Sequence, residues 1–223
     1  MNEIYVIAEA GINHNGNLKI AKKLVDIAKE CDANAVKFQT FWNIERLKKY
    51  ELTKDEFYEL KNYCDFKKID FLSTPHTFDA IHFLDDLVSM YKVASTYLGL
   101  PNFLMEVSNK NKPILLSTGS LIHKSGMATT EEITKALSFI SNPNIILMHC
   151  VSKYPYKNPN FSELGRLKKF NKTIGISDHS KLLEIPRAPY IEKHLKLNNN
   201  CIDKDVSLNP KQFKKFVKNM RVY

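Results

Sequence analysis

Eight short apolar runs alternate with amphipathic helical patterns along this chain of 223 residues, and they predict an α/β protein with the architecture of a (β/α)8 TIM barrel. Continuous apolar strands between helices are typical of a parallel sheet with both faces covered. Strict alternation through eight strands favours a closed barrel over an open doubly wound sheet. The segment at 10–16, AGINHNG, also lacks the Gly-x-Gly-x-x-Gly spacing of a dinucleotide-binding fold.

The expected elements follow one another at regular intervals. In the first helix, Leu18, Ala21, Leu24, Val25 and Ala28 fall on one face, as a period of 3.6 residues requires. Strands are expected at Tyr5–Ala10, Ala35–Thr40, Asp70–Thr74, Met90–Ala94, Pro113–Ser117, Ile145–His149, Thr173–Ser177 and Tyr190–Leu195. Helices are expected at Leu18–Cys31, Lys54–Lys67, Thr77–Leu87, Leu100–Asn109, Thr130–Ser141, Asn160–Phe170 and Pro210–Met220.

The chain is somewhat shorter than the ~250 residues typical of this barrel, and we expect residues 1–223 to form a single domain. The shortage falls between Ser180 and Tyr190, where Pro186 and Pro189 leave little room for a full helix. The seventh helix is therefore expected to be a stub.

Composition favours a cytoplasmic protein that binds neither membrane nor nucleic acid. No apolar run reaches the roughly 18 residues of a membrane helix, and Glu3 and Glu9 around the first apolar run do not fit a signal peptide. The four cysteines form no C-x-x-C pair, which is typical of reduced thiols. Only four of the 33 basic residues are arginine, so the net charge of +9 indicates solvated lysine-rich faces or an anionic small substrate.

Two histidines close the last two expected strands. His179 follows the run TIGIS, and His194 follows the run beginning at Tyr190. If these strands are parallel neighbours, both imidazoles emerge at the carboxyl end of the barrel, where such folds carry their active sites. Two neutral imidazoles in one opening form a candidate binding site for a divalent transition metal. His14, His76 and His149 are read more simply as core residues.

Two lysines, Lys37 and Lys92, lie inside otherwise apolar strands. A buried ammonium without a partner costs several kcal/mol. An anionic ligand would compensate, held by both lysines together with hydroxyl groups at strand ends (Thr74, Ser95 and Ser177). The alternative is an ion pair with a barrel carboxylate such as Glu9. By the same reasoning Glu192 is read as a partner that neutralises Lys193.

Seven segments in register resemble the sialic acid synthase family. They are IAEAGINHNGN at 7–17, KFQTF at 37–41, FLSTP at 71–75, KVAS at 92–95, LLSTG at 115–119, GISDHS at 175–180 and IEKHL at 191–195. The family comprises N-acetylneuraminate and N-acylneuraminate-9-phosphate synthases, the legionaminic and pseudaminic acid synthases, and spore-coat relatives.

The resemblance implies condensation of phosphoenolpyruvate with an N-acylated amino sugar such as N-acetylmannosamine, giving a nonulosonic acid and phosphate. It implies a divalent metal on His179 and His194, manganese or magnesium, with cobalt as an alternative. Carried over by motif, the residues that hold phosphoenolpyruvate are Lys37, Thr74, Lys92, Ser95, Ser152 and Ser177. Those that face the sugar or assist proton transfer are Glu9, Gln39, Tyr154 and Asp203.

The chain also departs from the family pattern. Tyr97 stands where a substrate-contacting glutamate is usual, 117–127 carries an insertion, and the loop before Ser207 keeps only Asp203. The C-terminal antifreeze-like domain of the family is not in this sequence, so a homodimer or a separate chain carrying that lid is the partner expectation. Two alternatives therefore stay open: an inactive or partner-dependent paralogue that keeps anion and metal binding, and a metal-assisted aldolase or lyase acting on another sugar.

Overall fold

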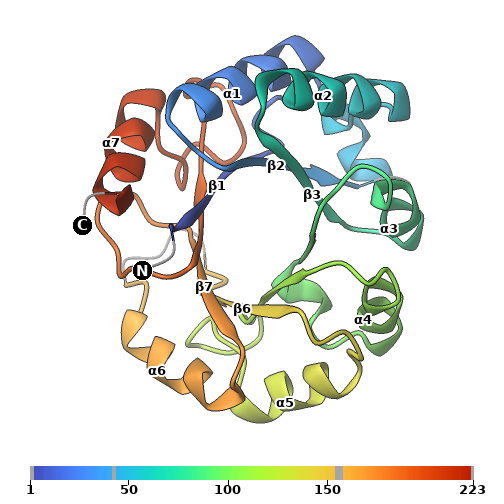
Figure 1. Ribbon diagram of the computed structural model, residues 1–223, viewed down its shortest axis with the longest axis vertical. Coiled ribbons are helices and arrows are strands. Elements are labelled where there is room, and N and C mark those ends of the chain that lie inside the picture. Colours follow the sequence, from blue (N-terminus) through green and yellow to red (C-terminus); the bar gives the residue numbers. More distant parts are fainter. Residues whose placement is uncertain (1–2, 42–43, 154–157, 222–223) are drawn as a thin grey trace.

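Eight parallel strands form a barrel at the centre of the computed structural model, which describes residues 3–41, 44–153 and 158–221. Their order is β3-β2-β1-β8-β7-β6-β5-β4, and β3 packs beside β4 to complete the ring (Figure 1). The predicted TIM barrel is therefore confirmed. The strands are β1 (Tyr5–Gly11), β2 (Ala35–Thr40), β3 (Asp70–Pro75), β4 (Tyr91–Val93), β5 (Ile114–Ser117), β6 (Ile145–Cys150), β7 (Thr173–Asp178) and β8 (Tyr190–His194).

Helices surround the ring on its outer side (Figure 1). The long ones begin where the sequence provides a cap: Thr53 and Thr129 each accept a backbone hydrogen bond, and the glutamate three residues later bonds back to the cap. The α-helices are α1 (Leu18–Glu30), α2 (Lys54–Lys67), α3 (Phe78–Leu84), α4 (Pro101–Ser108), α5 (Thr130–Ser138), α6 (Leu164–Leu167) and α7 (Pro210–Arg221). The 3-10 helices are η1 (Glu45–Tyr50), η2 (Ser95–Tyr97), η3 (Phe161–Glu163) and η4 (Lys168–Phe170). None of the described helices is long and apolar enough to cross a bilayer.

The sixth helical region differs from its prediction. One helix over 160–170 was expected, but the structure divides this stretch into η3, α6 and η4. Asn160 and Asn171 adopt left-handed backbone conformations at its two ends (φ 49° and 50°). Both asparagines thus bound the segment, since a left-handed residue ends a helix and asparagine tolerates that conformation.

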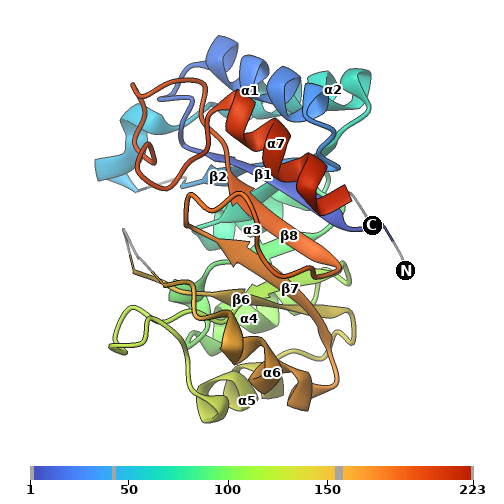
Figure 2. The same ribbon diagram turned by 90° about the vertical axis from the view of Figure 1, so that its left-hand side faces the viewer.

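The shortening at the seventh helix is confirmed and goes further than a stub. Residues 181–189 are all described and contain no helix. Ile185 and Ala188 are buried, so an irregular loop covers the outside of β7 and β8 between α6 and α7 (Figure 2). α7 holds this loop, because the side-chain amide of Asn219 donates to the Leu183 carbonyl at 3.0 Å.

Candidate active site

A cavity of about 240 Å³ lies at the carboxyl ends of the strands. Eleven of the twelve predicted site residues line it: Glu9, Lys37, Gln39, Thr74, Lys92, Ser95, Ser152, Ser177, His179, His194 and Asp203. Tyr154, the twelfth, lies outside the described residues. The structure therefore brings the candidates to one opening, while the chemical role of each stays a prediction.

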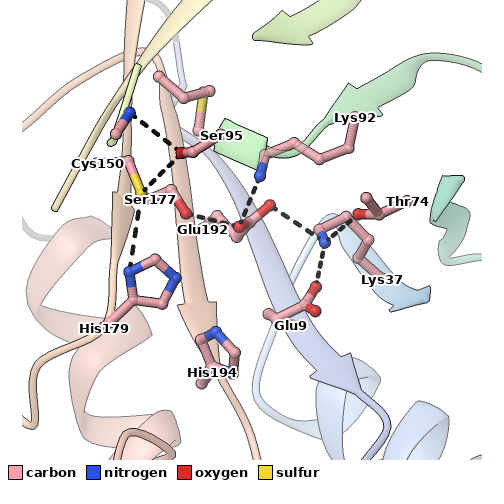
Figure 3. A network of polar contacts seen from close by, with 12 residues as sticks. Glu9, Lys37, Thr74, Lys92, Ser95, Cys150, Ser177, His179, Glu192 and His194 are labelled. Atoms are coloured by element: carbon pink, nitrogen blue, oxygen red, sulfur yellow. Dashed lines mark hydrogen bonds and ion pairs between the residues drawn. The ribbon is translucent and has the colours of Figure 1, made fainter. Parts of the chain in front are cut away.

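Lys37 lies at the centre of a buried polar network (Figure 3). Its Nζ is 2.5 Å from Glu9 Oε2, 3.6 Å from Glu192 Oε2, and donates to Thr74 Oγ1 at 2.9 Å. Burial disfavours its charge, but the two carboxylates more than compensate and raise the pKa of Lys37 above its usual value. Carboxylates of the barrel therefore compensate the buried ammonium, which confirms the alternative of an ion pair with Glu9. Whether Lys37 also holds an anionic ligand stays a prediction.

Glu192 joins the two lysines. Lys92 Nζ lies 3.3 Å from Glu192 Oε1, which also accepts a hydrogen bond from Ser177 Oγ at 2.7 Å. Burial opposes ionisation of this carboxyl, yet the charges of Lys37 and Lys92 hold the pKa of Glu192 well below its usual value. Two ammonium groups thus share one carboxylate on the wall of the cavity.

The interpretation of Glu192 as the partner of Lys193 was wrong. Successive residues of a strand point to opposite faces, so Glu192 and His194 face the cavity while Lys193 faces outward. Lys193 pairs instead with Asp178 and lies 5.3 Å from the ring centre of Phe216 in α7. The alternation with His194 was the sequence signal that would have placed Glu192 in the site.

Glu9 is poised to exchange a proton near neutral pH. It accepts a hydrogen bond from Gln39 Nε2 at 3.0 Å, and its side chain is almost fully buried. Burial raises the pKa of Glu9 to about 7, with a further contribution from Glu192, against the opposing attraction of Lys37. A carboxyl group with such a pKa can serve as a general base or acid at physiological pH.

His179 and His194 lie side by side, with ring centres 5.1 Å apart. Burial lowers the pKa of His179 to about 4, and burial with the adjacent His179 lowers the pKa of His194 well below its usual value. Both rings are therefore neutral and carry nitrogen lone pairs. Nδ1 of His194 is buried without a hydrogen-bond partner among the described residues, and the carboxylate of Asp203 lies 3.7 Å from it.

This donor set fits a divalent first-row metal ion. Imidazole nitrogens suit such ions, and a nearby carboxylate adds a harder donor. No group of three His, Cys, Asp or Glu side chains arranged around a metal position occurs in the described part of the chain. A metal ion held by the two imidazole nitrogens would keep coordination positions for substrate or water, as catalytic metal sites do.

The hydroxyl groups of Ser95 and Ser152 line the cavity beside the backbone of Gly119, and we call these two hydroxyls the hydroxyl wall. Ser95 Oγ accepts a hydrogen bond from the Gly119 N–H at 3.1 Å. A Cβ at Gly119 would lie 2.2 Å from Ser152 Oγ and 2.6 Å from Ser95 Oγ, so only glycine lets these hydroxyls converge. Cys150, which sequence reasoning did not place here, lies 3.7 Å from Ser95 Oγ and 3.9 Å from His179 Nδ1. Its inward position follows from the alternation of β6.

Asp203 reaches the cavity from the loop after β8. Its N–H donates to Asn13 Oδ1 at 3.0 Å, and Asn13 in turn donates to the Leu195 carbonyl at 2.8 Å. Burial raises the pKa of the Asp203 carboxyl. Of the three histidines interpreted as core residues, two agree with that interpretation: His14 packs on Phe38, and His149 Nε2 lies 2.8 Å from the Pro159 carbonyl. For the third, His76, the interpretation was wrong, because this residue lines the cavity.

Comparison with known proteins identifies the family. The NeuB family profile matches residues 42–223. The chain is 31% identical to an N,N'-diacetyllegionaminic acid synthase of Campylobacter jejuni, over 96% of this chain and 74% of that protein. It is 27% identical to the human N-acetylneuraminate-9-phosphate synthase, over 98% of this chain and 69% of that one.

A solved structure agrees with these sequence matches. The N-acetylneuraminic acid synthetase of Leptospira borgpetersenii, determined in complex with citrate, superposes with a TM-score of 0.90 at 32% identity. The alignment covers 98% of this chain and 83% of that one. The chain with the paired lysines, paired histidines and shared Glu192 at one barrel mouth therefore belongs to the NeuB family.

Proposed function

We propose that this protein is a nonulosonic acid synthase that condenses phosphoenolpyruvate with an N-acylated amino sugar of the N-acetylmannosamine type and releases phosphate. The observation that carries the proposal is the triad in which Lys37 and Lys92 share Glu192 beside a wall of hydroxyl groups. Membership in a family whose named relatives are sialic and legionaminic acid synthases supports the same reaction.

The two lysines and the hydroxyl wall suit the anionic substrate. Lys37 keeps its charge because of its two carboxylate neighbours, and Lys92 has spare donor capacity beyond Glu192. The hydroxyl groups of Ser95 and Ser152 add hydrogen-bond donors for the phosphate oxygens, whereas the hydroxyl of Ser177 already donates to Glu192. Fixed charges in a site with little water are often the largest catalytic contribution, because they need no reorganisation during the reaction.

The chemical step balances with groups present in the cavity. Carbon 3 of phosphoenolpyruvate attacks the aldehyde carbon of the open-chain sugar, which forms the new C–C bond and leaves positive charge at carbon 2. The aldehyde oxygen takes up a proton and becomes a hydroxyl group. Water adds to carbon 2, and the resulting tetrahedral centre collapses to a keto group as its C–O bond to phosphate breaks. Of the two protons of the water, one balances the proton taken up by the aldehyde oxygen and the other leaves with phosphate. Glu9, oriented by Gln39, is the group we assign to accept a proton of that water.

His179 and His194, with Asp203 close to His194, would hold a divalent metal, manganese or magnesium. Such an ion supplies Lewis-acid polarisation of a carbonyl oxygen when bound. The neutral state of both rings is what metal ligation requires, since a protonated imidazole has no lone pair to give.

Phosphate release tests the function. Purified protein is incubated with phosphoenolpyruvate, Mn²⁺ and a panel of N-acetylmannosamine and diacetamido sugars, and released phosphate and the keto acid are quantified. We expect both products in equal amounts, and their loss in Lys92→Met but not in Lys110→Met, a substitution on the outer surface. Binding of both substrates without release would support the inactive paralogue. Release with aldoses that lack the N-acyl group would support the aldolase.

A further inference from the structure

A histidine outside the predicted site set, His76, lies on the cavity wall directly after β3. Thr74 and His76 both line the cavity, as the two-residue period of a strand requires. The backbone N–H of His76 donates to the Thr40 carbonyl at 2.9 Å, so the pairing of β2 with β3 extends to this residue. His76 is therefore positioned by the barrel itself rather than by a free loop.

Aromatic rings hold the imidazole of His76 on two sides. Phe41 stacks on it with ring centres 4.3 Å apart and an interplanar angle of 15°. Tyr97 packs at 5.6 Å and is itself stacked on Phe103 at 4.1 Å. Tyr97 is not among the residues that line the cavity, so it contacts the imidazole from behind. The imidazole ring cannot turn without displacing Phe41 or Tyr97.

The hydrogen bonds of Tyr97 assign the tautomer of His76. The tyrosine hydroxyl has one hydrogen, and it is donated to the His76 carbonyl at 2.8 Å. The contact of 3.1 Å between His76 Nδ1 and the same hydroxyl oxygen must then be donated by Nδ1. Nε2 is consequently the nitrogen without a hydrogen, a pure acceptor. It is buried and has no hydrogen-bond partner among the residues described.

We propose that His76 is a specificity-determining residue, whose Nε2 accepts a hydrogen bond from a hydroxyl or amide N–H of the acceptor sugar, and that Tyr97 is its positioning residue. The inference rests on the proposed function. Fully ionised phosphoenolpyruvate has no O–H or N–H to offer a bare acceptor nitrogen, whereas an N-acylated sugar has several.

The surrounding charges favour a hydrogen bond between His76 and the sugar over a contact between His76 and the phosphate of phosphoenolpyruvate. Burial together with the charges of Lys37 and Lys92 lowers the pKa of His76 to about 3. The imidazole therefore remains neutral at physiological pH and adds no positive charge for the phosphate. A site that hydrogen-bonds a substrate hydroxyl discriminates strongly against analogues lacking it, because the protein acceptor is then left unpaired.

Three variants test the assignment by steady-state kinetics. His76→Phe keeps the stack on Phe41 and removes both nitrogens, and we expect KM for the sugar to rise about tenfold or more, as loss of one hydrogen bond predicts. KM for phosphoenolpyruvate should stay within about twofold. His76→Gln places an amide oxygen near the Nε2 position and should recover part of the loss. Tyr97→Phe keeps the stack on Phe103 but removes the hydroxyl group that fixes the tautomer of His76. It should therefore raise KM for the sugar less than His76→Phe does.

Deoxy sugars identify the donor, and His82→Asn, at an exposed histidine, is the matched control. For the analogue lacking the bonded donor, wild type and His76→Phe should have equal kcat/KM. An unchanged sugar KM in His76→Phe, or a rise confined to phosphoenolpyruvate, would overturn the assignment while leaving the synthase function standing. If the wild type binds no sugar of the panel by saturation-transfer NMR and releases no phosphate, both proposals fall.

Discussion

Lys92 and Glu192 form an ion pair inside the barrel, with Nζ 3.3 Å from Oε1 and neither side chain more than 6% exposed. Lys37 approaches the other oxygen of the same carboxylate at 3.6 Å. Two ammonium groups thus approach one carboxylate, and Glu9, which is 2.5 Å from Lys37, contributes the second carboxyl group of the network. This arrangement can bind a further anion, since a phosphate can interact with both lysines while they remain paired with Glu192.

Glu192→Gln should therefore destabilise the protein and make its stability sensitive to phosphate. Removing one partner of a buried pair leaves uncompensated charge and costs about 3–5 kcal/mol. We expect a loss near that size in urea unfolding, with partial recovery when phosphate or phosphoenolpyruvate is added. Glu163→Gln, which breaks the surface pair with Arg166, should cost less than about 1 kcal/mol. Equal stability of Glu192→Gln and wild type would contradict this account.

Removal of metal should abolish turnover, and the two histidines should account for its binding. We expect chelation to stop phosphate release and Mn²⁺ to restore it. His194→Ala and His179→Ala should weaken Mn²⁺ binding at least tenfold in titration calorimetry, because each removes a nitrogen ligand. His123→Asn, at the surface pair with Glu132, is the control and should bind as wild type does. Undiminished binding in both alanine variants would place the metal elsewhere.

The pH dependence of kcat/KM should report the carboxyl of Glu9. Its pKa is raised to about 7, and the proposed general base must be ionised. Activity should therefore be present above pH 7 and fall tenfold per unit as the pH drops below that value. Glu9→Gln should lose roughly 10²–10⁴-fold in rate and lose this limb of the profile. A wild-type profile that is flat from pH 5 to 8 would remove Glu9 from the proton-transfer role.

Gly119→Ala should weaken binding of phosphoenolpyruvate without unfolding the protein. The added Cβ would meet two serine hydroxyls at 2.2 and 2.6 Å, and these side chains can rotate away. Rotation would disperse the hydroxyl wall, so we expect KM for phosphoenolpyruvate to rise about tenfold, the loss of one hydrogen bond. Gly99→Ala, where nothing lies within 4 Å of the new Cβ, should leave KM unchanged. Equal KM values for the two variants would argue against a phosphate at this wall.

The periodicity of the sequence was enough to predict the barrel and most of the residues that line the cavity. Strand ends in a closed parallel barrel converge, so Lys37, Lys92, His179 and His194 could be placed together from chain position alone. Their pairing could not be obtained in this way. Which carboxylate approaches which ammonium depends on strand register across the ring, so the sharing of Glu192 by Lys37 and Lys92 could not be predicted.

Two other features could not be predicted from the apolar spacing of the sequence, one because it depends on a tertiary contact and one because it depends on backbone geometry. The orientation of Tyr97 is set by stacking on Phe103 in α4, and that stacking decides which nitrogen of His76 is bare. The sixth helical region reads as one helix by its apolar spacing, but left-handed asparagines at both ends leave room only for short turns. Local propensity was overruled at each of these points by packing or backbone geometry.

Helix α7 packs against the region between β7 and β8, where residues 181–189 form no helix. Because residues 181–189 form no helix, Phe216 of α7 covers the outward ammonium of Lys193, and Asn219 fastens the loop that follows His179. Strand β8, whose Glu192 and His194 point into the cavity, is thus covered on its outer side by α7. Mutations in α7 should therefore alter the active-site cavity through the backbone of β8, although the mutated residues contact no group inside the cavity.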